Sequence, residues 1–193
     1  MKKSLSKENF ELEFNKFWEQ VSLVGLQGYI HLEKAKNDLS IASCALNEET
    51  GCAYPGSLLV HINLVTALAK RIAKMVSGTF PIDENSLVKV CLLMHLSKID
   101  MYIPNDNQWE IEKRGLNYKF AELDGKLKFG ERSILNAMNM GINLTAEEFE
   151  AIKCLDNDGQ TKGDKYFESI MTTIVRQANE LAYAIEKEKY KRD

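Results

Sequence analysis

The stretch GCAYPGSLLVHINLVTALAKRIAKMV, residues 51–76, decides the fold of this chain. Its first part combines glycines with a proline, which marks a loop, and the loop ends at Ser57, a residue type suited to cap a helix. Apolar residues then recur every three or four positions, which indicates a long amphipathic helix. The predicted buried face comprises Leu58, Ile62, Val65, Ala69, Ile72 and Val76.

The sequence before this stretch predicts two more helices. One opens the chain, because large apolar residues recur there at helical spacing. A second helix is expected over residues 28–38 or slightly beyond. The apolar face of the opening helix comprises Phe10, Phe14, Phe17, Trp18 and Val21.

The sequence after residue 76 continues the helical pattern. Ser86 is expected to cap a helix that reads LVKVCLLMHLSK, which is apolar almost all round and therefore typical of a covered central helix. Helices resume over residues 131–140, and Thr145 with Glu148 predicts a capping box for the next one. The last helix is expected to begin near Tyr166, with a buried stripe of Ile170, Ile174, Ala178, Leu181 and Ile185.

Residues 102–128 interrupt this pattern. WEIEK, followed by RG and LNYKF, suggests a β-hairpin. Trp109, Tyr118 and Phe120 are expected to pack onto the domain, the alternative being that they stack a nucleic-acid base. The sequence as a whole predicts one all-α domain over residues 1–193, with about six helices and a small hairpin insertion.

Composition narrows the classes of function. Hydrophobic residues make up 45% of the 193 residues and charged residues 27%, which is ordinary for a soluble globular protein. The net charge of −3 and the dispersed basic residues argue against a nucleic-acid partner. No apolar stretch approaches the ~20 residues that cross a membrane. The four cysteines include no CxxC pair, so we expect a reducing cytoplasm.

Five landmarks follow one another along the chain: GCAYPGSLLVH (51–61), LLMHLSK (92–98), KFGERS (128–133), LTAEEFEAIKCLD (144–156) and RQANELA (176–182). Their order and spacing resemble the HD-domain metal-dependent phosphohydrolases, especially compact hydrolases of phage and mobile elements and the HD part of a 3′–5′ exoribonuclease. The matching stretches there read AYPGGLLEH, LLHDLCK, GHGEKS, LTDEEAxAIRWH and AD. The resemblance covers about residues 25–185 and implies a single HD-like helical bundle.

The resemblance also implies a metal site from which most ligands are missing. His61 matches the first family histidine, while Met94 and His95 take the places of the His–Asp pair, counted from Lys98. A thioether prefers soft metals, so Met94 cannot replace an imidazole, whereas His95 could still coordinate. In the less favoured register His95 is the family histidine, which would rotate the helix by about 100 degrees relative to Lys98.

The remaining ligand positions are occupied by Phe129, Leu155 and Asn179. Phenylalanine and leucine offer no lone pair to a metal, and asparagine is a weak neutral ligand. With Met94, the two apolar replacements are expected to fill a formerly polar cavity. We therefore expect no catalytic residues, no bound metal and no cofactor.

Three further residues match polar groups around the family pocket, namely Lys98, Arg132 and Ser133. Basic groups in HD enzymes help to hold substrate phosphate, and arginine suits a bidentate contact. The alternative is that Lys98 and Arg132 are surface charges, or pair with Glu131, Asp100 or Glu147. The candidate ligand-binding residues are His61, His95, Lys98, Arg132, Ser133 and Asn179.

Three hypotheses about function remain open. The first is a protein that binds a nucleotide or another phosphate-bearing small molecule without hydrolysing it. The second is a regulatory scaffold with a protein partner. The third is a phosphohydrolase with an atypical metal site built from His61, His95 and a nearby acid such as Asp100. An open basic pocket would favour the first, and a closed pocket with a large apolar patch would favour the second.

Overall fold

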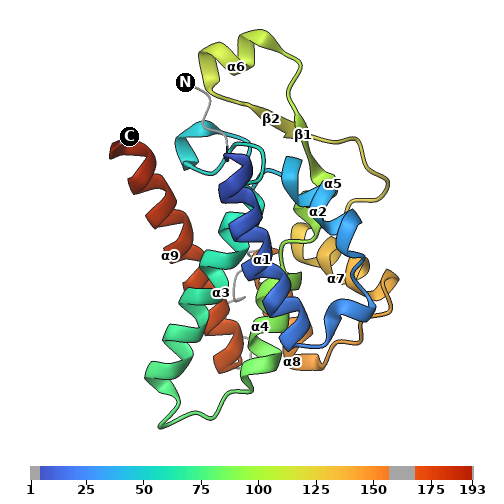
Figure 1. The fold of residues 1–193 in the computed structure, drawn as a ribbon, viewed down its shortest axis with the longest axis vertical. Coiled ribbons are helices and arrows are strands. Elements are labelled where there is room, and N and C mark those ends of the chain that lie inside the picture. Colours follow the sequence, from blue (N-terminus) through green and yellow to red (C-terminus); the bar gives the residue numbers. More distant parts are fainter. Residues whose placement is uncertain (1–4, 157–167, 193) are drawn as a thin grey trace, which may run out of the picture.

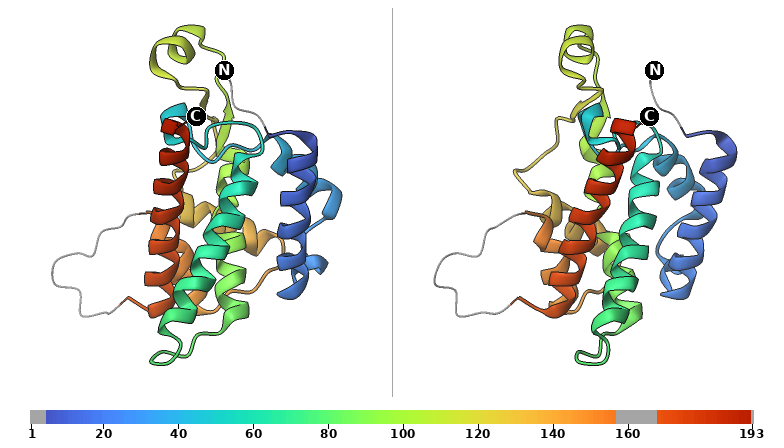
Figure 2. Two further views of the ribbon diagram at one scale, coloured as in Figure 1. Left: turned by 60° about the vertical axis from the view of Figure 1, so that its left-hand side comes forward. Right: turned by 90° about the vertical axis from the view of Figure 1, so that its left-hand side faces the viewer.

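The computed structural model describes residues 5–156 and 168–192, and these are mostly helical with one small two-stranded hairpin, as the sequence predicts. Helix α3 lies between α1 and α9 in both views of Figure 2, while α6 and the hairpin lie at one end of the molecule (Figure 1). The helices are α1 (Lys7–Leu23), α2 (Leu32–Ile41), α3 (Ser57–Val76), α4 (Glu84–Leu93), α5 (Ser97–Met101), α6 (Gln108–Arg114), α7 (Phe129–Asn139), α8 (Ala146–Lys153) and α9 (Ile170–Arg192).

The predicted apolar faces of the long helices are largely confirmed. Four residues of the α3 stripe are buried, namely Leu58, Ile62, Val65 and Ala69, and Phe10, Phe14 and Phe17 of α1 pack against the same core. In α9 the buried face runs through Ile174, Ala178, Ala182 and Glu186. The prediction of Leu181 on that face was wrong, since it is exposed. Tyr166 lies outside the described residues.

Two predicted helix caps were wrong, because each serine makes a tertiary contact instead. Gly56 precedes α3 as its N-cap, and the Ser57 hydroxyl donates to the Cys52 carbonyl oxygen at 2.6 Å. Asp83 caps α4, and the Ser86 hydroxyl donates to a Glu148 carboxylate oxygen at 2.7 Å. Ser86 therefore joins α4 to α8, while Ser57 ties the start of α3 to the connection before it.

The predicted central helix over residues 87–98 is interrupted. Helix α4 ends at Leu93, and α5 begins at Ser97. The turn between them carries Met94 and His95, and both side chains are completely buried. The break therefore turns the chain at the point where the candidate histidine enters the core.

Residues 102–128 contain the predicted hairpin, and one of its two strands lies in the predicted LNYKF stretch, whereas WEIEK is not a strand. Strand β1 (Tyr102–Pro104) pairs antiparallel with β2 (Tyr118–Phe120), and α6 lies between them. The WEIEK stretch is helical because Asn107 caps it at its start and Gly115 ends it in the left-handed region. Tyr118 is buried as expected, whereas the prediction that Trp109 is packed was wrong, since it is 60% exposed. Phe120 is 53% exposed, but its ring packs against those of Tyr102 and Phe129.

Helices α4 and α8 are joined by a buried carboxylate. Glu148 completes the predicted capping box with Thr145, and it accepts hydrogen bonds from Ser86 and from Lys89, whose Nζ lies 2.8 Å away. Lys89 also donates to the Asn143 carbonyl oxygen at 2.7 Å. Burial raises the pKa of Glu148, but the contacts with Lys89, Ser86 and Thr145 outweigh it and leave that pKa below its ordinary value. Folding therefore favours the ionised form of Glu148.

This arrangement predicts a stability change in acid. A carboxyl group whose pKa is lower in the folded state stabilises the fold above its unfolded pKa, about 4.3, and loses this contribution as the pH falls through the folded pKa. We expect Glu148→Gln to be less stable than the wild type at pH 7 by about 1–2 kcal/mol, and the difference to shrink below about pH 4. Urea unfolding from pH 7 to pH 3 measures both curves.

The neighbouring Glu147 gives the matched control, because it is exposed in the same helical turn. Glu147→Gln should follow the wild-type curve throughout. A Glu148→Gln curve parallel to that of the wild type would contradict a role for the ionised carboxylate.

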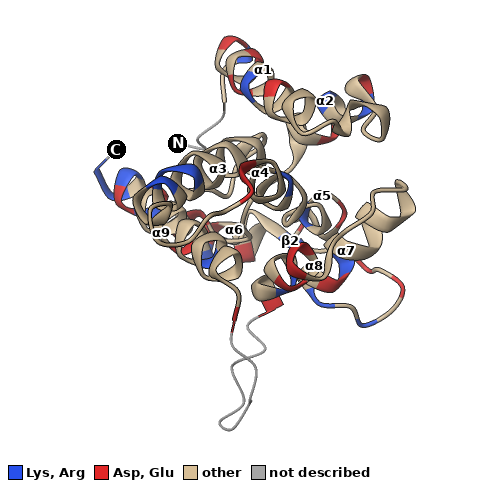
Figure 3. Ribbon diagram, turned by 90° about the horizontal axis from the view of Figure 1, so that it is seen from below, with Lys and Arg blue, Asp and Glu red and all other residues tan. Residues whose placement is uncertain are grey.

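The surface carries both signs of charge. Figure 3 shows Lys and Arg interspersed with Asp and Glu on the helices seen from below, with a basic end to α9 that includes Lys189, Lys191 and Arg192. Within residues 5–156 and 168–192, no helix combines the length and the apolar character that crossing a membrane requires.

Candidate functional site

A buried polar core lies where α3, α9 and the turn between α4 and α5 meet. His61 of α3 is completely buried, and both of its ring nitrogens are engaged by α9. Its Nδ1 lies 2.9 Å from a Glu186 carboxylate oxygen, and its Nε2 lies 3.0 Å from the Asn179 amide oxygen. Because both neighbours are oxygen acceptors, the ring donates from both nitrogens and is therefore the charged imidazolium.

The surroundings of His61 favour this charge. Burial lowers the pKa of His61, but Cys44 and Glu186 outweigh burial and raise it to about 9. An imidazolium has no free lone pair, so His61 in this state cannot coordinate a metal. It instead ties α3 to α9.

His95 is the second histidine of the core, and its ring lies edge-on to that of His61, with the centroids 4.9 Å apart. Burial, together with the nearby Lys98 and His61, lowers the pKa of His95 well below its ordinary value, so this ring is neutral. Within the part of the chain that the structure describes, neither ring nitrogen makes a hydrogen bond of standard geometry, although Asn179 lies close enough to oppose the lowering of the pKa. Such a buried polar group is rare in folded proteins.

Lys98 places a positive charge inside the same core. The residue is only 5% exposed. The ammonium donates to the Cys44 carbonyl oxygen at 2.9 Å and to the Tyr183 hydroxyl, and it lies 3.6 Å from the Cys44 sulfur. The predicted surface position, and the alternative pairing with Asp100, Glu131 or Glu147, were therefore wrong for Lys98. Its charge is held by internal partners.

Residues 42–56 close this core from the side of the α2–α3 connection. The Ser57 hydroxyl accepts from the Cys44 amide at 3.0 Å and donates to the Cys52 carbonyl oxygen at 2.6 Å, so it ties two cysteines of the connection together. Gly51 has a φ of +78°, and an added Cβ would meet the Glu186 carbonyl oxygen at 2.3 Å. Only glycine allows the loop to approach α9 this closely.

The thiols and the tyrosine of this core have pKa values shifted in opposite directions. Burial raises the pKa of the Cys44 thiol, but a hydrogen bond from Cys52 and the charges of His61 and Lys98 bring it well below its ordinary value. Cys52 shows the opposite shift, since its hydrogen bond with Cys44 and its burial raise its pKa. Burial and the nearby Cys44 likewise raise the pKa of Tyr183. Cys44 is therefore the most acidic thiol in this cluster.

These residues do not fit a metal site of the kind that the resemblance implies. His61 uses both nitrogens for hydrogen bonds, and the Lys98 ammonium would repel a divalent cation. Among the described residues, no three side chains of His, Cys, Asp or Glu are grouped to hold a metal ion. Hydrolysis by a metal-bound water needs at least three such ligands in fixed geometry.

The three apolar residues at the predicted ligand positions have different surroundings. Met94 is completely buried, as expected for a residue that fills a cavity. Phe129 is half-buried and instead packs in an aromatic cluster, with its ring edge-on to that of Tyr102 at 5.8 Å and tilted against that of Phe120 at 6.1 Å. Leu155 is half-buried at the edge of the core. Only Met94 is completely buried among the three.

The two remaining candidates, Ser133 and Arg132, make their hydrogen bonds to groups other than the two histidines. The Ser133 hydroxyl donates to the Met94 carbonyl oxygen at 2.8 Å and accepts from the Ser97 amide at 3.0 Å, so it secures α7 to the α4–α5 turn. Arg132 donates to the backbone carbonyl oxygens of Asp124 and Gly125. The structure thus brings His61, His95, Lys98 and Asn179 together, and it gives Ser133 and Arg132 other partners.

Sequence reasoning missed three members of the core, namely Cys44, Tyr183 and Glu186. Two of them had a detectable signal, because Tyr183 and Glu186 follow Asn179 by four and seven residues and therefore share its helical face. Cys44 had none, since it belongs to an irregular connection.

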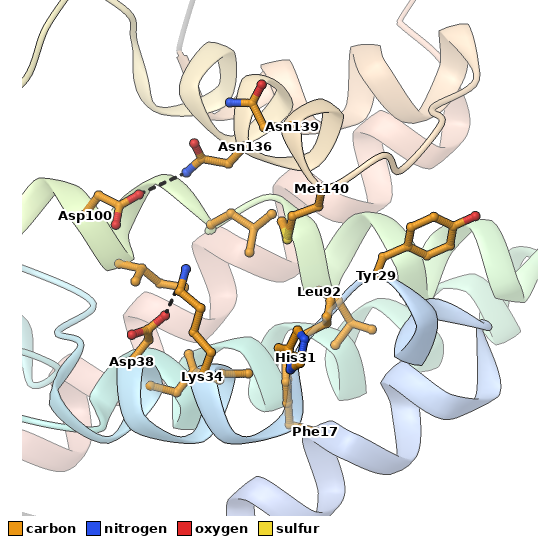
Figure 4. A pocket seen from close by; sticks show the side chains of 15 residues that line it. Phe17, Tyr29, His31, Lys34, Asp38, Leu92, Asp100, Asn136, Asn139 and Met140 are labelled. Atoms are coloured by element: carbon orange, nitrogen blue, oxygen red, sulfur yellow. Dashed lines mark hydrogen bonds and ion pairs between the residues drawn. The ribbon is translucent and has the colours of Figure 1, made fainter.

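A separate pocket opens between α2, α5 and α7, and its volume is about 340 Å³. Apolar residues such as Phe17, Leu92 and Met140 line its interior. Figure 4 shows two polar pairs on opposite walls. Lys34 and Asp38 lie on α2 with 3.7 Å between charged atoms, while Asp100 of α5 accepts from Asn136 of α7 at 3.3 Å. His31 and Asn139 also lie on the lining.

Comparison with family models, with curated proteins and with solved structures found no match for this chain.

Proposed function

We propose that this chain is an HD-like helical protein that binds a small ligand without hydrolysing a phosphate ester. The order of the five sequence landmarks supports the HD-like assignment, and the mainly helical structure is consistent with it. The absence of hydrolysis is supported by one observation above all. His61, the residue that matches the first family ligand, donates from both ring nitrogens to Glu186 and Asn179.

The pocket between α2, α5 and α7 is the proposed binding site. Its volume of about 340 Å³ falls within the range of small-molecule sites, roughly 300–1,000 Å³. Its apolar interior and few polar groups also match the usual composition of such sites. The former metal centre is less suitable, because His61, His95 and Ser133 are completely buried.

The charges of the pocket indicate the chemistry of its ligand. Its lining holds the carboxylates of Asp38 and Asp100 and the ammonium of Lys34, which is already paired with Asp38. Asp100 accepts a hydrogen bond from Asn136 but has no ion pair among the described residues, so its carboxylate would repel an anionic phosphate and attract an amine or amide group. We therefore propose a small amphipathic ligand with an apolar body and a nitrogen donor directed at Asp100.

A thermal-shift screen tests this proposal, because a ligand that binds only the folded state stabilises it by about 2.7 kcal/mol at one hundred times its Kd. The probes are small aromatic amines, their amides, and nucleotides. We expect shifts with amines or amides that disappear in Asp100→Ala. Asp106→Ala is the matched control, since Asp106 is an exposed carboxylate outside the pocket, and it should respond like the wild type.

The other outcomes of the screen assign the other hypotheses. A shift with nucleotides that disappears in Arg132→Glu would return the proposed site to the phosphate-binding residues around the former metal centre. A complete lack of shifts would contradict ligand binding and leave the regulatory scaffold as the remaining hypothesis.

A further inference from the structure

Cys44 and Cys52 lie side by side in the connection between α2 and α3, and nothing in the proposed ligand binding uses them. Both side chains are buried, at 0% and 1% exposure. The Ser57 hydroxyl bridges the Cys44 amide and the Cys52 carbonyl oxygen, which holds the two backbones close together. The Ser43 hydroxyl contacts the same Cys52 carbonyl oxygen at 3.5 Å. The geometry brings two thiols to one place in a segment without long helices.

The two thiols have different surroundings. The Cys44 sulfur lies 3.6 Å from the Lys98 ammonium and 3.4 Å from the Tyr183 hydroxyl. A cation at this distance stabilises a thiolate, which is the nucleophilic form of cysteine. The Cys52 sulfur instead contacts the Thr50 hydroxyl at 3.5 Å. The Cys44 sulfur is therefore the nucleophile of the pair, and Cys52 remains a neutral thiol beside it.

The core also offers hydrogen-bonding groups to a small molecule. His95 is completely buried, and its two ring nitrogens make no hydrogen bond of standard geometry among the described residues, with Asn179 as a polar neighbour. Buried imidazole nitrogens of this kind are normally satisfied by water or another small molecule. Hydrogen peroxide is close to water in size and can both donate and accept hydrogen bonds. A brief opening of residues 42–56 would give it access, because local opening of an irregular segment needs less free energy than global unfolding.

We propose that Cys44 and Cys52 form a peroxide-reactive pair that is oxidised to a reversible disulfide. The Cys44 thiolate attacks one peroxide oxygen, the O–O bond breaks, and the departing hydroxide takes a proton to become water. The Cys52 sulfur then attacks the Cys44 sulfenic acid, an S–S bond forms, and the second oxygen leaves as water with the Cys52 proton. Two thiols lose two electrons, and one peroxide is reduced to two waters.

The chain contains its own control pair. Cys91 is completely buried, and Cys154 lies near enough to raise its pKa further after burial has done so. The pKa of Cys91 is raised to about 12, so this thiol is protonated at neutral pH. Cys91 and Cys154 should therefore stay reduced under conditions that oxidise Cys44 and Cys52.

The experiment treats the folded full-length chain with hydrogen peroxide, blocks the remaining thiols with an alkylating reagent in denaturant, and counts them by mass. We expect two of the four cysteines to be protected from the alkylating reagent, and the mass of the chain before alkylation to be lower by two hydrogens. Dithiothreitol should restore all four. Cleavage after Glu48 and Glu49 separates the two cysteines in sequence, so their peptides remain joined only by a disulfide.

Each other outcome would overturn the proposal. These outcomes are four free thiols after treatment, an added oxygen on Cys44 with Cys52 still free, an oxygen bridge between Cys44 and Lys98, or equal oxidation of Cys91 and Cys154. Cys44→Ser should keep its three thiols in peroxide, whereas Cys52→Ser should keep two, because its Cys44 is still oxidised to a sulfenic acid that has no thiol beside it to attack. The peptide linkage in the wild type decides the matter even if a serine variant does not fold.

Discussion

Replacing Lys98 with alanine is expected to destabilise the fold by about 4 kcal/mol. The substitution removes hydrogen bonds from a charged donor, each worth about 1.5–3 kcal/mol, and leaves the Cys44 carbonyl oxygen and the Tyr183 hydroxyl without their partner. It also empties the space of a side chain that is almost completely buried. Urea unfolding followed by circular dichroism measures this loss.

Lys74→Ala is the matched control, because Lys74 is an exposed residue of α3. Its effect should stay within about 0.5 kcal/mol of the wild type. If Lys98 were instead a ligand-binding residue in an open pocket, Lys98→Ala would be nearly as stable as Lys74→Ala. That result would contradict the closed polar core.

Replacing Glu186 with alanine is expected to destabilise the fold by about 3 kcal/mol, since it leaves the buried imidazolium of His61 without its carboxylate. The pKa of His61 should also fall, because Glu186 is one of the groups that raise it. Glu186→Gln keeps an oxygen acceptor but removes the charge, so its stability should lie between that of the wild type and that of Glu186→Ala. Unfolding free energies and imidazole proton resonances followed against pH measure both effects.

Glu188 provides the control on the same helix, where it is exposed and pairs with Lys191. Glu188→Ala should change stability by less than about 1 kcal/mol, as is usual for a surface ion pair. Equal losses in Glu186→Ala and Glu188→Ala would show that the carboxylate at position 186 has no special role in the core.

The sequence predicted those elements whose pattern is set by local chemistry. The stripes of α1 and α3 follow from apolar spacing, and the capping box of Thr145 and Glu148 needs only four consecutive residues. The α6 stretch was mistaken for a strand because WEIEK alternates apolar and charged residues. Asn107 before it and Gly115 after it are helix start and stop signals that would have corrected the assignment.

The candidate site could be predicted only in part. Spacing along the five landmarks identified His61, His95, Lys98 and Asn179, which do meet in one core. It could not identify their partners, because Cys44 and Lys98 are brought together only by the tertiary structure. Nor could it anticipate that Lys98 turns inward, since a lysine beside Asp100 in sequence is usually solvated.

We propose that the core around His61 and His95 is held together by internal hydrogen bonds and a lysine rather than by a metal ion. Isothermal titration calorimetry of the purified, chelator-treated chain with manganese, and separately with zinc, tests it most directly. We predict no saturable binding by the wild type at this core. Binding of about one metal ion per chain that is lost in both His61→Ala and His95→Ala, with each variant shown to be folded, would contradict the account.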